Sequence, residues 1–160
     1  MFFLLPVLLL TGCNRPEKSF SPFKEGAVWD VAFEDLRFTV FTSPGVSDAE
    51  ITFSEPEILK NMKVKIGADG LSADFGDMNV PITEAFIGNV FPFYRAVRAL
   101  SESETQQAEQ NDVTYRAILN GDGSVSGIEV KGTDGKTVVY TVLSAVRRND
   151  NSKSQSQDPS

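Results

Sequence analysis

Apolar and polar residues alternate along two blocks of the chain, residues 26–80 and 113–144, and this period of two predicts β-strands with one buried face. In the first block, Trp29, Val31 and Phe33 alternate with polar residues such as Asp30 and Glu34. This alternation predicts eight or nine strands. The eight lie at residues 27–33, 36–40, 51–53, 62–66, 71–75, 113–119, 125–130 and 137–143.

Short turns separate these strands. Asp69-Gly70, Asp122-Gly123 and Asp134-Gly135 each stand between two strands, and Glu34-Asp35 forms another turn. Asp-Gly favours the positive backbone angles of a tight hairpin. Neighbouring strands are therefore expected to be antiparallel.

Residues 83–100 interrupt the alternation and predict the single helical region, since apolar residues recur there every three or four positions. Thr83 is a suitable N-terminal cap, whereas Gly88 and Pro92 predict a kink or two short helices. Residues 101–112 are expected to be a polar loop or a fraying end. The fold class is thus mainly β (α+β), a curved antiparallel sheet with one kinked helix on its concave face.

The chain begins with a short apolar run followed by Leu10-Thr11-Gly12-Cys13, the pattern of a bacterial lipobox. We expect a signal peptide at residues 1–12 and lipidation of Cys13, because small residues give the peptidase access to the bond before the thiol. The alternative is a buried apolar segment with a chance cysteine. No Lys or Arg precedes Arg15, which indicates an upstream start codon or an atypical signal.

The expected organisation is a signal peptide at 1–12, a tether at 13–24, one domain at 25–148 and a disordered polar tail at 149–160. The tether contains two prolines and no hydrophobic period, and the tail contains no large apolar residue. The protein is expected on the extracytoplasmic face of the cell membrane.

Composition excludes several classes of function. Fifteen Lys and Arg against 22 Asp and Glu give a net charge of −7, which argues against nucleic acid as a partner. The absence of His and the single Cys exclude an internal disulfide, a Cys/His zinc site and a His-based triad. Carboxylate pairs such as Asp74/Asp77 lie at turns, and no calcium loop or phosphate loop is present. We therefore expect a protein that is not an enzyme, with no metal and no cofactor.

Aromatic residues concentrate in the strands and the helix. They either fill a core or line an apolar hollow between sheet and helix that could hold a ligand. The candidate lining residues are Trp29, Phe33, Phe38, Phe53, Phe86, Val90, Phe93 and Val97.

These features resemble the LolA/LolB-like family of bacterial lipoprotein carriers and receptors. The resemblance rests on the lipobox, the two strand blocks around one helical insertion, the passage from Ile51 to Met62, and the closing hairpin from Tyr115 to Val142. The passage is similar to one in small lipoproteins of Gram-positive bacteria, although Asn61 stands where Gly is usual. The resemblance implies a LolA-like half-barrel, and it implies lipoprotein carriage only through the fold.

Two functions follow as hypotheses. In the first, the membrane-anchored lipoprotein binds a lipid or another apolar ligand, such as the acylated end of another lipoprotein. In the second, it is a non-catalytic protein-interaction module of the cell envelope whose core is filled by its own side chains. An open apolar pocket between sheet and helix favours the first hypothesis, and a packed core favours the second.

Overall fold

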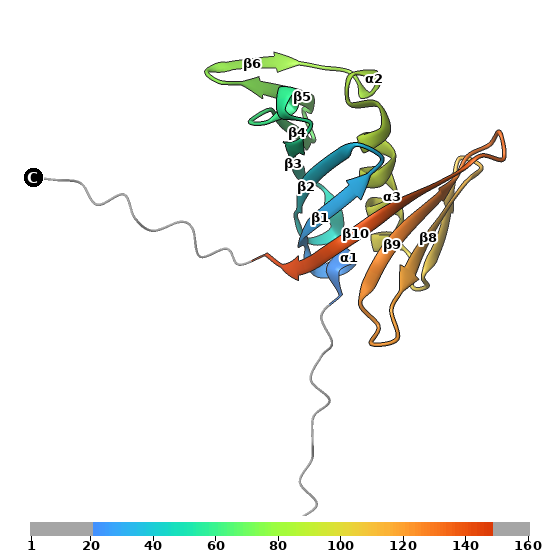
Figure 1. The fold of residues 1–160 in the computed structure, drawn as a ribbon. Coiled ribbons are helices and arrows are strands. Elements are labelled where there is room, and N and C mark those ends of the chain that lie inside the picture. Colours follow the sequence, from blue (N-terminus) through green and yellow to red (C-terminus); the bar gives the residue numbers. More distant parts are fainter. Residues whose placement is uncertain (1–20, 149–160) are drawn as a thin grey trace, which may run out of the picture.

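The computed structural model describes residues 21–148, which form one open, curved, antiparallel sheet of ten strands and one long helix (Figure 1). The fold is mainly β, as expected. The strands are β1 (Ala27–Phe33), β2 (Leu36–Thr42), β3 (Ala49–Glu55), β4 (Lys63–Gly67), β5 (Gly70–Phe75), β6 (Met78–Pro81), β7 (Gln107–Gln110), β8 (Val113–Leu119), β9 (Val125–Lys131) and β10 (Thr137–Arg147).

Two hairpin meanders make up the sheet, and the first and last strands join them. The spatial order is β6-β5-β4-β3-β2-β1-β10-β9-β8-β7, so every neighbouring pair except β1 and β10 is consecutive in the chain. Val28 pairs with both Phe41 of β2 and Val146 of β10, which places the two meanders in one continuous sheet.

The helical region is broken where the sequence predicts a kink. It consists of α2 (Glu84–Ile87), a short 3₁₀ turn η3 (Gly88–Val90) and α3 (Phe91–Glu102). Gly88 has a φ of +43°, a conformation that favours glycine, and Pro92 stands at the start of α3, where its missing N–H costs nothing. The α3 helix lies on the concave side of the sheet, between its two halves (Figure 1).

Two strands occur where none was expected. β6 follows β5 through the Gly76-Asp77 turn, and β7 lies within residues 101–112, which were expected to be a loop or a fraying end. Both are four-residue edge strands, and neither has a buried residue. β6 supplies only two alternating apolar residues before Pro81, and β7 is polar apart from Ala108, so the period-two signal is weak in both.

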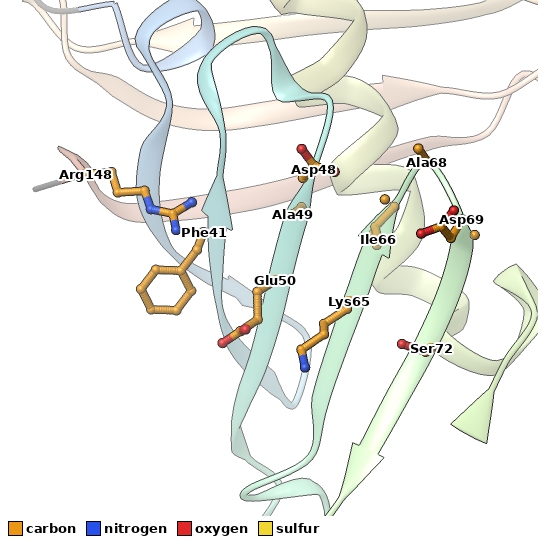
Figure 2. Close-up of a pocket in the computed structure, with 12 residues that line it drawn as sticks. Phe41, Asp48, Ala49, Glu50, Lys65, Ile66, Ala68, Asp69, Ser72 and Arg148 are labelled. Carbon is orange, nitrogen blue, oxygen red and sulfur yellow. The ribbon is translucent and has the colours of Figure 1, made fainter. Parts of the chain in front are cut away.

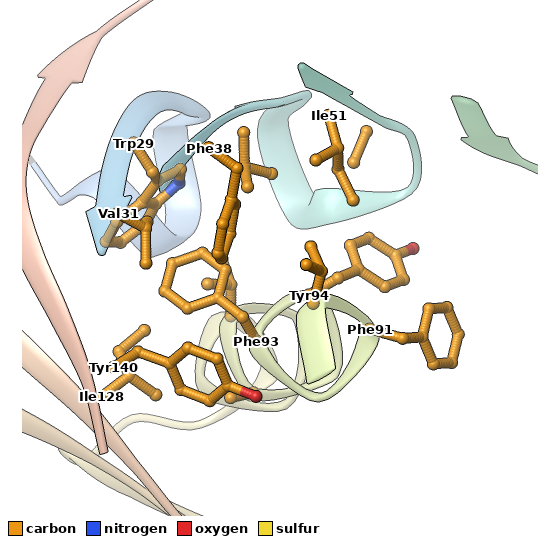
Figure 3. Packing of buried hydrophobic residues seen from close by; sticks show 14 of the residues in the cluster. Trp29, Val31, Phe38, Ile51, Phe91, Phe93, Tyr94, Ile128 and Tyr140 are labelled. Atoms are coloured by element: carbon orange, nitrogen blue, oxygen red, sulfur yellow. The ribbon is translucent and has the colours of Figure 1, made fainter. Parts of the chain in front are cut away.

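The core lies between α3 and the middle strands. Figure 3 shows Phe93 of α3 pointing at Trp29 and Phe38 from the first meander and at Tyr140 from the second. Its ring centroid is 6.0, 5.8 and 5.4 Å from those of Trp29, Phe38 and Tyr140, each in an edge-on arrangement. Edge-on aromatic pairs are favourable beyond the area that they bury, so Phe93 connects both halves of the sheet.

A four-residue helix, α1 (Pro22–Glu25), closes one end of this core. Its Phe23 ring packs 5.2 Å from that of Trp29, and the Glu25 carboxylate accepts a hydrogen bond of 2.8 Å from Arg147 on β10. Residues 22–24, assigned to the tether in the sequence analysis, are thus part of this helix. Two further 3₁₀ turns, η1 (Pro44–Val46) and η2 (Glu57–Leu59), connect strands.

Candidate functional site

Six of the eight candidate lining residues pack against one another between helix and sheet. They are Trp29, Phe38, Phe53, Val90, Phe93 and Val97, and all of them are more than nine-tenths buried. Phe93, at the centre, has no exposed surface. The space in which the sequence suggested a hollow is therefore occupied by the protein's own buried side chains.

The other two candidates lie elsewhere. Phe33 is half-buried at the end of β1, with its ring 4.8 Å from that of Tyr140. Phe86 on α2 is 53% exposed and stacks edge-on against Phe75 of β5, with ring centroids 6.2 Å apart. The eight residues consequently do not form one surface.

Polar groups inside the core have partners. The Thr42 hydroxyl, which is buried, accepts hydrogen bonds from the Ala27 amide and the Trp29 indole, and it donates one to the Ala27 carbonyl. The Tyr140 hydroxyl donates to the Asn89 carbonyl, and burial raises the pKa of this hydroxyl. No buried side-chain polar atom of residues 21–148 lacks a hydrogen-bond partner. The described interior therefore offers no unsatisfied group to a ligand.

Four exposed apolar side chains lie together at the β6 end of the sheet. We call β4, β5 and β6 the arm, and the four exposed apolar side chains of β5, β6 and the neighbouring α2 the arm patch. The arm patch consists of Phe75 (40% exposed), Met78 (65%), Val80 (42%) and Phe86 (53%). Phe75 pairs with Met78, and the buried Ala73 pairs with Val80, so the patch continues the core face of the sheet.

The arm patch is exposed because α3 is too short to cover ten strands. A helix of 12 residues is about 18 Å long, whereas ten strands span about 43 Å. The main partners of α3 are α1, η1, η3 and strands β7, β8 and β9, and Figure 1 shows the arm extending away from it. Of the described helices, α2 reaches the arm through the contact of Phe86 with Phe75 of β5.

The free edge of β6 is poorly suited to pairing with another strand. The Ile82 amide donates to the Leu71 carbonyl, so alternation directs the backbone groups of Asn79 and Pro81 outward. Pro81 has no amide hydrogen, which leaves this short edge with few donors for a further strand.

A concavity of about 460 Å³ lies on the face of the sheet opposite α3, which is the convex face (Figure 2). Phe41, Glu50, Lys65 and Ser72 pair across β2 to β5 and form its floor, with Arg148 beside Phe41. The Lys65 ammonium lies 2.7 Å from the Asp74 carboxylate; this hydrogen bond raises the pKa of Lys65 and lowers that of Asp74. The concavity is a solvated, charge-paired surface.

A groove of about 640 Å³ opens between α1, the end of α3 and the β8–β9 turn. Its apolar lining includes Phe23, Leu100, Leu119 and Val125, and serine, threonine and glutamine residues supply much of the remainder. None of the eight candidate lining residues contributes to it.

The described residues contain no group of three or more His, Cys, Asp or Glu side chains that could hold a metal ion. The Asp-Gly pairs considered as calcium ligands lie in hairpin turns, where for example Asp122 accepts hydrogen bonds from Ser124. Within residues 21–148, no helix is both long and apolar enough to cross a membrane. Cys13, the signal peptide and the polar tail lie outside the described residues.

Three of the four arm-patch residues were missed as candidates. Phe75 was treated as part of a strand, and Met78 and Val80 lie in the unexpected β6. The available signal was the Gly76-Asp77 turn followed by an apolar residue at every second position, although Pro81 weakens it.

Comparisons with protein-family models, with curated proteins and with solved structures found no match to this chain. The resemblance to LolA/LolB-like proteins therefore stays a prediction.

Proposed function

We propose that this protein is a non-catalytic interaction module of the cell envelope, attached to the membrane by lipid on Cys13. It acts by presenting an apolar surface to a partner rather than by enclosing an apolar ligand. The observation that carries the proposal is the packing around Phe93, which occupies the space that a bound acyl chain would need.

The location of the arm patch supports the same proposal. Figure 1 shows α1, where the described chain begins, at the opposite end of the molecule from β6 and α2. A lipid on Cys13 would hold the α1 end towards the membrane, because only seven residues separate Cys13 from Ser21, so the two lie at most about 29 Å apart in an extended chain. The arm patch would then face away from the membrane, towards other envelope proteins.

Lipid binding is the second candidate, and the groove beside α1 favours it. The groove is large enough for part of an acyl chain and has apolar side chains on several sides. A lipid there would contact Phe23 and displace no core residue.

Native mass spectrometry of the protein extracted from its own membrane separates the two candidates. We expect the mass of the chain from Cys13 onward plus covalent acyl groups, with nothing released on gentle activation. The Cys13→Ser variant should lack the acyl mass and leave the membrane fraction, or stay uncleaved. A lipid released without breaking a covalent bond would favour the carrier, and a processed, membrane-retained Cys13→Ser variant would refute the anchor.

A further inference from the structure

The arm leaves a site for a helix. α2 is one turn long and reaches the arm at Phe86, whose ring packs against that of Phe75 on β5, and the other end of the concave face is covered by α3. β6 is four residues long, about 13 Å, which matches between two and three turns of α-helix. A helix with apolar residues at positions i, i+3 or i+4, and i+7 presents a stripe of this length.

A strand fits the arm poorly, and so does the polar segment at residues 149–160. Pro81 removes an outward donor from the free edge, which disfavours strand addition. Residues 149–160 contain no large apolar residue to place against Phe75 or Phe86. The chain enters the domain at α1, at the opposite end from the arm (Figure 1).

An acidic side chain without an ion pair in the described residues lies beside the arm patch. Asp77 lies in the turn between Phe75 and Met78, and it makes no ion pair within residues 21–148. Glu84 begins α2, and its half-exposed carboxylate lies 3.0 Å from Arg95. Because the whole chain carries a net charge of −7, a partner with positive charges beside its apolar stripe is electrostatically favoured.

We infer that the arm patch binds an amphipathic helix of another protein, with an apolar stripe of two to three turns flanked by Lys or Arg. This inference rests on the proposed function and specifies its partner. The helix lies along β5 and β6, beside α2, and extends the helical layer that α3 begins. Its apolar residues contact Met78, Val80 and Phe86, and a basic residue reaches Asp77.

The test uses the full lipid-anchored protein in phosphatidylcholine vesicles and a fluorescent helical peptide with a leucine stripe and lysines at both ends. A twin peptide carries glutamate in place of lysine, and protein-free vesicles give the background. Fluorescence anisotropy measures binding at two salt concentrations. Val80→Ser and Phe86→Ser should each weaken binding of the lysine peptide at least tenfold.

Val139→Ser is the matched control. Val139 is also a strand valine, 47% exposed against 42% for Val80, but it lies on β10. Its substitution should leave binding within twofold of wild type. Asp77→Asn should weaken binding about threefold and reduce its salt dependence, and the glutamate twin should bind more weakly than the lysine peptide.

Equal losses in Val139→Ser and Val80→Ser would overturn the inference, as would equal binding of the two peptides or no binding to wild type. A dimer that Phe86→Ser dissociates would instead identify a second copy of the chain as the occupant. Vesicle binding by the unlipidated Cys13→Ser variant that Phe86→Ser abolishes would identify a lipid surface. If the lysine peptide does not bind, the inference about a partner helix fails. The proposed interaction module is tested separately by native mass spectrometry, which does not involve the arm.

Discussion

Among the described glycines, Gly26 has the least room for a side chain. It ends α1 with a φ of +77°, and a Cβ there would lie 2.8 Å from the Thr42 carbonyl oxygen and 2.9 Å from the Pro44 nitrogen. These are backbone atoms, so they cannot move aside as a flexible side chain could. The close approach lets α1 lie beside η1, with Phe23 against Trp29.

Gly26→Ala should lower the free energy of unfolding by about 2 kcal/mol or more, because it adds both a steric clash and an unfavourable φ. Gly123→Ala is the control: Gly123 also has a positive φ, +83°, but no atom lies within 4 Å of its Cβ position. That change should cost about 1 kcal/mol. Urea unfolding measures both, and equal losses would contradict the role assigned to the close approach.

Tyr140 gives the domain a dependence on alkaline pH. Burial raises the pKa of its hydroxyl above the unfolded value of about 10, so the folded state holds this proton more tightly. The resulting stabilisation is complete below pH 10 and decreases as the pH rises through the folded-state pKa. Tyr140 also donates a hydrogen bond to the Asn89 carbonyl.

The melting temperature of wild type should therefore fall above about pH 10, and that of Tyr140→Phe should fall less steeply. At neutral pH the variant should lose about 1 kcal/mol with the hydrogen bond. Thermal unfolding followed by circular dichroism at several pH values measures both effects. Identical slopes in the two proteins would show that Tyr140 does not control this dependence.

At the scale of elements, α3 holds the two meanders together. Phe93 contacts aromatic residues of β1, β2 and β10, and these strands join the two halves of the sheet. α2 has a different role, because the break at Gly88 separates it from α3 and leaves Phe86 outside the core.

Phe93→Ala should cost about 3–5 kcal/mol of unfolding free energy, the range for a buried aromatic residue in a filled core. Phe86→Ala is the control on the same helical region and should cost less than about 1 kcal/mol, because Phe86 is half exposed. Chemical denaturation of both variants measures the difference. Similar small costs would mean that the space around Phe93 is not filled.

The sequence predicted those elements that have a buried face. Eight strands, the Asp-Gly turns and the helix break follow from alternation, turn residues and the positions of Gly88 and Pro92. β6 and β7 were missed because neither strand buries a residue. Phe86 was predicted to lie between helix and sheet because it continues the helical spacing. Spacing alone does not give the orientation of α2 relative to α3 across the break at Gly88.

At the scale of the whole molecule, the two ends of the sheet differ. The end at β7 is close to α3 and carries polar residues, whereas the arm has an apolar face and little helical cover. This asymmetry, together with the filled centre, is the basis for proposing a surface that binds a partner. We therefore expect that the domain encloses no apolar ligand, either between helix and sheet or in the groove beside α1.

Trp29 tests this claim most directly, because it is the only tryptophan, has no exposed surface, and contacts both Phe93 and the groove residue Phe23. The measurement is quenching of its fluorescence by a fatty acid brominated near the end of its chain. We expect no quenching of Trp29. A tryptophan placed in the arm patch by Phe86→Trp, in a Trp29→Phe background, should be accessible to the same quencher. Saturable quenching of Trp29 in the folded protein would place the ligand in the interior or the groove and contradict the proposal that the domain encloses no apolar ligand.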